Sequence, residues 1–172
     1  MSTPLFQIGL SRRAWRGPTA PEKQYDPELD NIVSIINDAC ELVAGDATLR
    51  FEVAGFGQAP WPVDVMTDLA VVIEQLPEAI GKLEAGKPFK LDFFEQGIER
   101  CVTAVPDDRS VRLTCRSMTT WQPSPLTIEM SKPALLRMLV DLLSAFLSLL
   151  DGALPWARSH PWVRAWLRPS QS

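Results

Sequence analysis

The chain has 172 residues, of which 46% are hydrophobic and 22% charged, so it can form one domain with its own core, and its composition argues against disorder. His160 is the sole histidine and no CxxC pair occurs, which disfavours structural zinc and a Ser–His–Asp triad. Three widely spaced cysteines, Cys40, Cys101 and Cys115, favour reduced thiols in the cytosol over a disulfide framework. No signal peptide is visible, so we expect a cytoplasmic protein without catalytic residues, cofactor or metal.

The net charge of −4 hides an asymmetry along the sequence. Residues 20–108 contain 18 acidic and 6 basic residues, a balance of −12, whereas the remainder contains 3 acidic and 11 basic ones. An acidic middle disfavours nucleic acid and suits a basic partner. Alternatively, the basic ends fold back onto this middle.

The N-terminal part predicts an irregular segment over residues 1–25, which contains three prolines, followed by a helix over residues 27–44. Asp26 is suited to cap this helix and Pro27 to occupy its first position. Apolar side chains recur at helical spacing through the range, and Gly45 follows it as a suitable end.

A strand is predicted over residues 49–54, because apolar and charged residues alternate there. The stretch "GFGQAPWP" then marks a turn. A second helix is predicted over residues 64–85, where an apolar stripe continues across Pro77. A proline removes a helical hydrogen bond and clashes with the preceding turn, so we expect Pro77 to kink or divide this helix.

Three consecutive strands are predicted over residues 89–95, 98–105 and 111–118, joined by short turns. A long apolar helix follows over residues 132–150, with Ser131 as its cap. Strands in succession, flanked by amphipathic helices, predict an α+β fold with a mainly antiparallel sheet packed against the helices.

The register of the three strands depends on their turns. If Val105 pairs with Val111, Cys101 lies opposite Cys115 on the neighbouring strand. A three-residue first turn then places Phe93 opposite Cys101, on the same side of the sheet. This register predicts one core face that includes Cys101, Thr103, Val105, Val111, Leu113 and Cys115.

The C-terminal part begins with an apolar stretch between Arg137 and Asp151. It is shorter than the roughly 20 residues that cross a bilayer, so we expect a buried helix and no membrane span. The tail, residues 152–172, interleaves three tryptophans with arginines. It either packs on the domain, with its arginines against the acidic middle, or binds nucleic acid or a membrane surface. We favour packing, with residues 1–172 as a single domain.

Glu95 and Glu99 face each other across the first turn in this register. Opposed like charges destabilise a strand pair, so these carboxylates require an explanation. They are solvated or paired with Arg100 or Arg116, or they receive a cation from a partner. A third possibility is a catalytic carboxylate pair of the kind that glycosidases use.

The order of these segments resembles small bacterial immunity proteins of polymorphic toxin systems, including those encoded beside type VI-secreted and Rhs-type toxins. The resemblance covers about residues 47–150 and lies in the succession of "GFGQAPWP", "TDLAVVIEQLPEAIGKLEAG", "FKLDFFEQGIERCVTAV" and "SVRLTCRSMT" before an apolar helix. It implies a non-catalytic protein that binds one cognate toxin tightly, often over the toxin's active site. It carries no shared catalytic residues.

The expected function is therefore an immunity protein that neutralises a toxin by direct contact, through an acidic surface that suits a basic partner. Alternatives are a cytosolic chaperone or adaptor for a secreted protein, docking through the last apolar helix, and a small enzyme. Strand ends and turns are accessible to a partner, and tryptophan is frequent in binding hot spots. The residues expected to contact the toxin are Trp61, Asp92, Glu95, Glu99, Asp107, Asp108 and Trp121.

Overall fold

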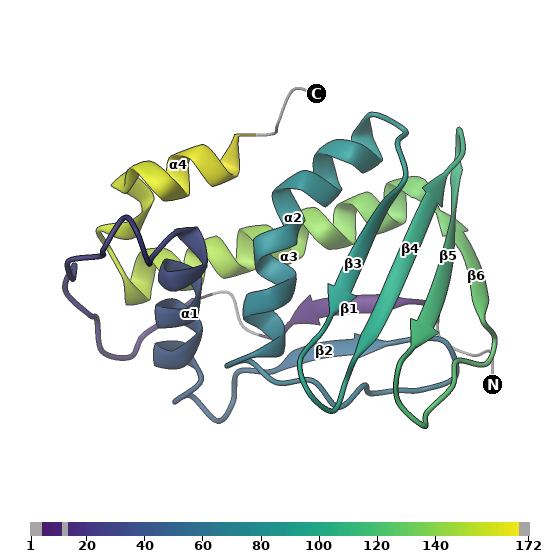
Figure 1. Cartoon of the computed structure of the whole chain (residues 1–172), viewed down its shortest axis with the longest axis horizontal. Helices are drawn as coiled ribbons and strands as arrows, with labels where there is room; N and C mark the ends of the chain where they lie inside the picture. The colour runs from purple at the N-terminus through teal and green to yellow at the C-terminus, as the bar shows by residue number, and fades with distance from the viewer. Residues whose placement is uncertain (1–4, 12–13, 169–172) are drawn as a thin grey trace.

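The structure is a computed structural model that describes residues 5–11 and 14–168. Within these residues, four helices accompany two antiparallel sheets, one of four strands and one of two. This confirms the expected α+β fold. Figure 1 shows the four-stranded sheet on one side of the molecule, with helices α2 (Asp68–Glu84) and α3 (Lys132–Ala153) lying against it.

The four-stranded sheet has the order β3 (Phe89–Phe93), β4 (Arg100–Pro106), β5 (Ser110–Ser117) and β6 (Thr127–Ser131). Buried and exposed side chains alternate along each strand, so one face packs on the helices and the other is largely polar. Strand β6 was not expected from the sequence. Its five residues, "TIEMS", alternate in burial as a strand does, but they are too few to stand out before the long helix that follows.

The second sheet pairs β1 (Gln7–Leu10) with β2 (Phe51–Ala54), antiparallel to each other. The prediction of an irregular segment over residues 1–25 is therefore wrong at β1. The strand predicted over residues 49–54 forms as β2, but it pairs with β1 rather than joining the main sheet. Partners more than 40 residues apart in the chain leave no local signal of such a pair.

Helix α1 (Ile32–Val43) starts later than the sequence predicts. Its cap is Asn31, whose side chain accepts the Val33 N–H at 2.8 Å. Asp26 instead closes a turn, since its carboxylate accepts the Glu28 N–H at 2.9 Å. The predicted cap at Asp26 is wrong because two suitable capping residues precede the same apolar stripe, and the second one begins the helix.

Helix α2 continues through Pro77 without a break, although Figure 1 shows its axis changing direction partway along. A kink was one of the two expected outcomes, and division of the helix did not occur. At its start, Thr67 is the N-cap residue, and the Asp64 carboxylate accepts the Thr67 N–H at 2.7 Å. Asp64 thus supplies the capping acceptor that Thr67 lacks.

Helix α3 is capped by Ser131, as predicted, since the Ser131 hydroxyl accepts the Ala134 N–H at 3.3 Å. With 22 residues, it is the one helix among the described residues that is long and apolar enough to cross a membrane. Core helices of soluble proteins also meet this criterion of length and composition. The expectation that this segment is too short to span is therefore wrong. The helix packs against both sheets and against α1 and α2. Its exposed side carries Arg137, Val140, Asp141, Ser144, Ser148 and Asp151.

The tail forms a short 3₁₀ turn, η1 (Ala157–Ser159), and helix α4 (Pro161–Leu167), which pack on the rest of the fold. The indole N–H of Trp156 donates to the Ala20 carbonyl at 3.0 Å, and that of Trp166 donates to the Glu74 carbonyl at 2.9 Å. Of the tail arginines, Arg158 pairs with Asp151, outside the acidic middle. Residues 169–172 of the predicted tail lie outside the described residues.

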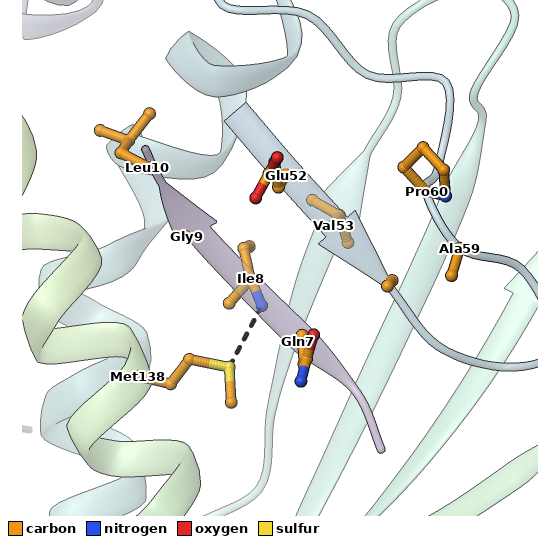
Figure 2. A pocket seen from close by; sticks show the side chains of 10 residues that line it. Gln7, Ile8, Gly9, Leu10, Glu52, Val53, Ala59, Pro60 and Met138 are labelled. Atoms are coloured by element: carbon orange, nitrogen blue, oxygen red, sulfur yellow. Dashed lines mark hydrogen bonds between the residues drawn. The ribbon is translucent and has the colours of Figure 1, made fainter. Parts of the chain in front are cut away.

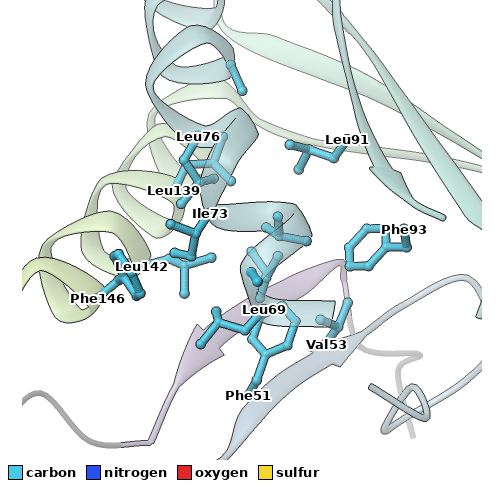
Figure 3. Close-up of a cluster of buried hydrophobic side chains, with 14 of the residues drawn as sticks. Phe51, Val53, Leu69, Ile73, Leu76, Leu91, Phe93, Leu139, Leu142 and Phe146 are labelled. Carbon is cyan, nitrogen blue, oxygen red and sulfur yellow. The ribbon is translucent and has the colours of Figure 1, made fainter. Parts of the chain in front are cut away.

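A single hydrophobic cluster runs between the sheets and the helices. Figure 3 shows its centre, where α2 lies between α3, the first strands of the large sheet and the small sheet. Each fully buried side chain of this kind contributes about 1.5–3 kcal/mol of transfer free energy. The labelled members are Phe51, Val53, Leu69, Ile73, Leu76, Leu91, Phe93, Leu139, Leu142 and Phe146.

Candidate functional site

The register of β4 differs by one residue from the prediction. Val102, not Cys101, pairs with Cys115, and Pro106, not Val105, pairs with Val111. The cause is the β4–β5 turn, which the Asp107 N–H closes by donating to the Ser110 carbonyl at 2.8 Å. Four residues, 107–110, separate the paired Pro106 and Val111, whereas five were expected between Val105 and Val111, and this change inverts which side chains of β4 face the core. Cys101 and Cys115 therefore lie on adjacent strands but on opposite faces of the sheet.

The shift places Arg100 on the buried face. It pairs with Phe93 of β3, and only 4% of its surface is exposed. A buried arginine normally has a carboxylate partner, because an unpaired charge is costly in a low-dielectric interior. Within the described residues, no salt bridge to Arg100 is present. Burial lowers the pKa of its guanidinium to about 10, and the nearby Cys115 opposes that change.

Two tryptophans and a glutamine surround this guanidinium. Its central carbon lies 3.5 Å from the ring centre of Trp121 and 4.5 Å from that of Trp61. Its Nη2 donates to the Gln58 side-chain oxygen at 2.6 Å. The remaining nitrogens, Nε and Nη1, are buried and find no hydrogen-bond acceptor among the described residues. Cation–π contacts stabilise the charge but do not satisfy these donors.

Three connections converge at this end of the large sheet, and together they are called the loop end: residues 55–67, 94–99 and 118–126. The Ser124 N–H donates to the Phe56 carbonyl at 2.8 Å, and the Met118 N–H to the Glu99 carbonyl at 2.9 Å. Gly57 allows the first contact, since a Cβ there would lie 2.2 Å from the Ser124 oxygen. The loops are thus tied to one another around Arg100.

The backbone of the loop end is strained at two residues that are not glycine. Phe56 has a φ of 55° and Glu99 a φ of 39°. Side chains disfavour this left-handed region, so such residues persist only where their surroundings hold them, and they concentrate at functional sites. Phe56 is fully buried against Phe6 and Trp61, which supplies that constraint.

Large apolar side chains are exposed on the same loops. Phe94 is 63% exposed, Met118 69% and Leu126 58%. Loops carried by a rigid sheet are common binding elements, and exposed aromatic and methionine side chains are enriched at the centres of protein interfaces. This composition makes the loop end the candidate functional site.

The predicted contact residues divide between two ends of the sheet. Glu95 and Glu99 lie in the loop end, but not opposite each other on paired strands, because the Glu95 carbonyl accepts the backbone N–H of Ile98 and of Glu99. Asp107 and Asp108 occupy the β4–β5 turn at the other end. The seven residues of β4 separate the two ends by about 20 Å.

The remaining three predicted residues differ in accessibility. Trp61 is 2% exposed and belongs to the core, with its indole N–H donating to the Gly55 carbonyl at 3.1 Å. Trp121 is half-buried at the loop end. Asp92 lies on the polar face of the sheet, where Lys90 forms an ion pair with it at 3.2 Å.

An acidic groove adjoins the loop end between α1, α2 and the β3–β4 connection. Its volume is about 330 Å³. It contains three carboxylates and no lysine or arginine among its described lining residues, and Phe94 stands at its side. The lining residues are Val33, Asn37, Glu41, Met66, Thr67, Ala70, Val71, Glu74, Phe94 and Glu95.

A second hollow, of about 600 Å³, lies over the small sheet (Figure 2). Its edge has an unusual contact, in which the Ile8 N–H donates to the Met138 sulfur at 3.1 Å. Sulfur is a weak acceptor, so this bond only partly satisfies the free edge of β1. Glu52 is the one charged side chain among its described lining residues.

Sequence reasoning missed Gln58 and Phe94, and it considered Arg100 only as an ion-pair partner of Glu95 or Glu99. Two signals were present in the sequence. Gly55 and Gly57 lie just before Gln58, and Phe94, the second aromatic in "DFFEQG", does not fit the alternation that buries Phe89, Leu91 and Phe93. Within the described residues, no group of three or more His, Cys, Asp or Glu side chains could hold a metal ion.

Comparison with family models, curated proteins and solved structures found no significant match to this chain.

Proposed function

We propose that the protein binds a partner protein through the loop end and the acidic groove. The observation that carries this proposal is the exposure of Phe94, Met118 and Leu126 on the interconnected loops. Exposed apolar side chains grouped beside charged ones are typical of interaction sites. More than half of the surface of each of these side chains is not covered by the described residues.

The acidic groove indicates the charge of that partner. Its carboxylates, Glu41, Glu74 and Glu95, have no basic neighbour in the groove lining. A lysine or arginine of the partner would neutralise them, and an arginine adds geometric specificity through paired hydrogen bonds. The partner therefore presents a cationic side chain next to an apolar patch.

We further propose that the partner is a bacterial toxin and that binding neutralises it in the cytoplasm. This step rests on the resemblance of the segment order to immunity proteins. In this role the protein is not an enzyme and acts by covering the toxin's active site. The chaperone alternative ranks lower, because the exposed side of α3 is mainly polar and so offers a poor apolar dock.

Reversing charge at the two ends of the sheet tests where the partner binds. Partners are captured from the native host with the intact protein and identified by mass spectrometry. The variant E95K/E99K is expected to weaken binding at least about tenfold and to reduce protection of cells that express the toxin. The matched variant D107K/D108K makes the same charge change about 20 Å away and should alter affinity less than about threefold.

Equal effects of the two variants would contradict a local site and would indicate a general electrostatic attraction instead. An unchanged affinity for E95K/E99K would place the interface outside the loop end. Capture of a partner that is not toxic to the host would overturn the toxin assignment. The location of the binding site would still be tested by comparing E95K/E99K with D107K/D108K.

A further inference from the structure

Arg100 has an incomplete set of contacts in the isolated chain. Gln58 accepts from one of its nitrogens, whereas Nε and Nη1 are buried without an acceptor in the described residues. Leaving a buried donor unpaired costs about 1–3 kcal/mol, and more for a charged group. A methionine of similar length would avoid this cost entirely, so the arginine is poorly explained by stability alone.

Nearby carboxylates of the same chain do not fill this gap. Glu95 and Glu99 occupy the adjacent connection, but neither carboxylate accepts a hydrogen bond from Nε or Nη1 of Arg100. Glu99 adopts a strained backbone, with a φ of 39°, and remains exposed. The local fold therefore leaves two guanidinium nitrogens without an acceptor, although two acids lie in the adjacent connection.

We infer that Arg100 receives a carboxylate from an acidic side chain of the partner, and this inference rests on the proposed binding function. The loop end surrounds Arg100, and the half-buried ring of Trp121 lies 3.5 Å from its central carbon. In this proposal the Trp121 ring moves aside when the partner binds, so that a side chain of the partner reaches the guanidinium. An incoming aspartate or glutamate then accepts hydrogen bonds from the unpaired nitrogens, and the pair is stronger than in water because the two indoles exclude solvent.

The inference gives the site two complementary contacts. The acidic groove takes a cation from the partner, and Arg100 takes an anion a short distance along the same loops. A binding site that presents both charges side by side selects its partner more strictly than a site of a single charge. A misaligned partner would place like charges against each other. Unpaired donors in the free protein are the expected cost of such a prepared site.

The first test compares Arg100→Met with the wild type in two measurements. The isolated variant is expected to melt at a higher temperature, because it removes two buried donors that have no acceptor. Its affinity for the captured partner is expected to fall at least about tenfold. A lower melting temperature together with unchanged affinity would overturn the inference and make Arg100 a structural residue.

Arg100→Lys keeps the charge but loses the planar set of donors, and it serves if Arg100→Met does not fold. Binding weakened at least about tenfold in a folded Arg100→Lys protein supports the inference, and wild-type binding overturns it. A partner-free measurement uses sodium formate, the smallest carboxylate, against sodium chloride at equal ionic strength. Formate is expected to raise the melting temperature of the wild type more than that of Arg100→Met.

These arms separate failure of the inference from failure of the proposed function. If E95K/E99K weakens binding and Arg100→Met does not, the loop end binds a partner but Arg100 receives no carboxylate. If no partner is captured, the proposed function fails. The formate measurement then decides the inference alone, and an equal response of wild type and Arg100→Met overturns it.

Discussion

Asp68 is a buried carboxylate at the first position of α2, and 4% of its surface is exposed. Its Oδ2 accepts the Asp64 N–H at 2.9 Å, whereas its Oδ1 has no hydrogen-bond partner among the described residues. Burial raises the pKa of Asp68 to about 6, and the charges of Asp64 and Glu95 add to this, while the bond from Asp64 opposes it. The group is therefore easier to bury as the neutral acid.

This shift has a defined consequence for stability. The folded-state pKa of about 6 lies above the ordinary value of 3.8, so the folded protein binds the proton more tightly than the unfolded chain. The contribution of Asp68 is fully present below about pH 4 and is lost as the pH rises through 6. We expect Asp68→Asn to be more stable than the wild type by about 1–3 kcal/mol at pH 7. At pH 4 the difference should approach zero.

Urea unfolding of both proteins at several pH values measures this effect. Asparagine retains an oxygen to accept the Asp64 N–H, so the comparison isolates the charge. Parallel stability curves for the two proteins between pH 4 and pH 7 would show that the Asp68 carboxylate titrates normally.

The cysteines differ in accessibility, and this gives a second test at the residue scale. Cys40 and Cys115 are fully buried, and burial raises the pKa of their thiols to about 12 and about 11. Cys101 faces the polar side of the sheet and is partly exposed. In the folded protein we expect a thiol reagent such as Ellman's reagent to modify Cys101 alone, and slowly, because burial and Asp92 also raise its pKa.

Cys101→Ser should then leave no thiol that reacts before unfolding, and all three thiols of the wild type should react in denaturant. Oxidation should not join Cys101 to Cys115 within one folded chain, because they face opposite sides of the sheet. Fast modification of Cys115, or an intramolecular disulfide formed without unfolding, would contradict the register described above.

At the scale of elements, Gln75 of α2 completes the free edge of β3. Its side chain accepts the Asp92 N–H at 2.8 Å and donates to the Asp92 carbonyl at 2.9 Å. An amide side chain thus imitates one step of a neighbouring strand. Edge strands with unpaired backbone groups promote association between chains, so this contact also protects the sheet.

We expect Gln75→Ala to lower the free energy of unfolding by about 1–3 kcal/mol, since two backbone groups lose partners at once. Glu78→Ala is the matched control on the same helix, because Glu78 is exposed and its ion pair among the described residues is with Lys82. It should change stability by less than about 0.5 kcal/mol. Denaturant unfolding measures both, and light scattering detects any association. Equal stability of the two variants would mean that solvent replaces Gln75 without loss.

Elements with strong local patterns could be predicted from the sequence, whereas the pairing of β4 could not. The faces of β3 and β5 were assigned correctly, and the error was confined to β4. In β4 both parities are comparably apolar, since Val102 and Ala104 compete with Cys101 and Val105. Choosing the correct parity also required burying Arg100, which sequence reasoning disfavours.

The same error explains why the candidate site was only half predictable. Trp61 and Trp121 were singled out as aromatic anchors, but the residue that joins them was not, because it breaks the rule that arginines stay exposed. Places where local rules fail are expected to be strained or functional. The strained Phe56 lies in the loop end, which surrounds Arg100 at the start of β4.

At the scale of the whole molecule, residues 14–25 pack against the segment that follows α3. The Ala20 N–H donates to the Ala153 carbonyl at 2.9 Å, and the Trp156 indole N–H donates back to the Ala20 carbonyl at 3.0 Å. Tyr25 packs against Trp156 with ring centres 6.1 Å apart, and its hydroxyl donates to Asp38 of α1 at 2.6 Å. Residues 14–25 therefore depend on the C-terminal segment for their position.

Trp156→Ala removes both the ring and the hydrogen bond from this junction. We expect residues 14–25 to open locally while the sheets and α3 stay folded, because the other contacts of the core are untouched. Limited trypsin digestion followed by mass spectrometry should show cleavage after Arg16 and Lys23 at least several-fold faster than in the wild type. Trp156→Phe keeps an aromatic ring against Tyr25 and loses only the bond to Ala20, so its rates should fall between the two. Wild-type cleavage rates in Trp156→Ala would mean that the remaining contacts, among them the Ala20–Ala153 and Tyr25–Asp38 hydrogen bonds, hold the junction without Trp156.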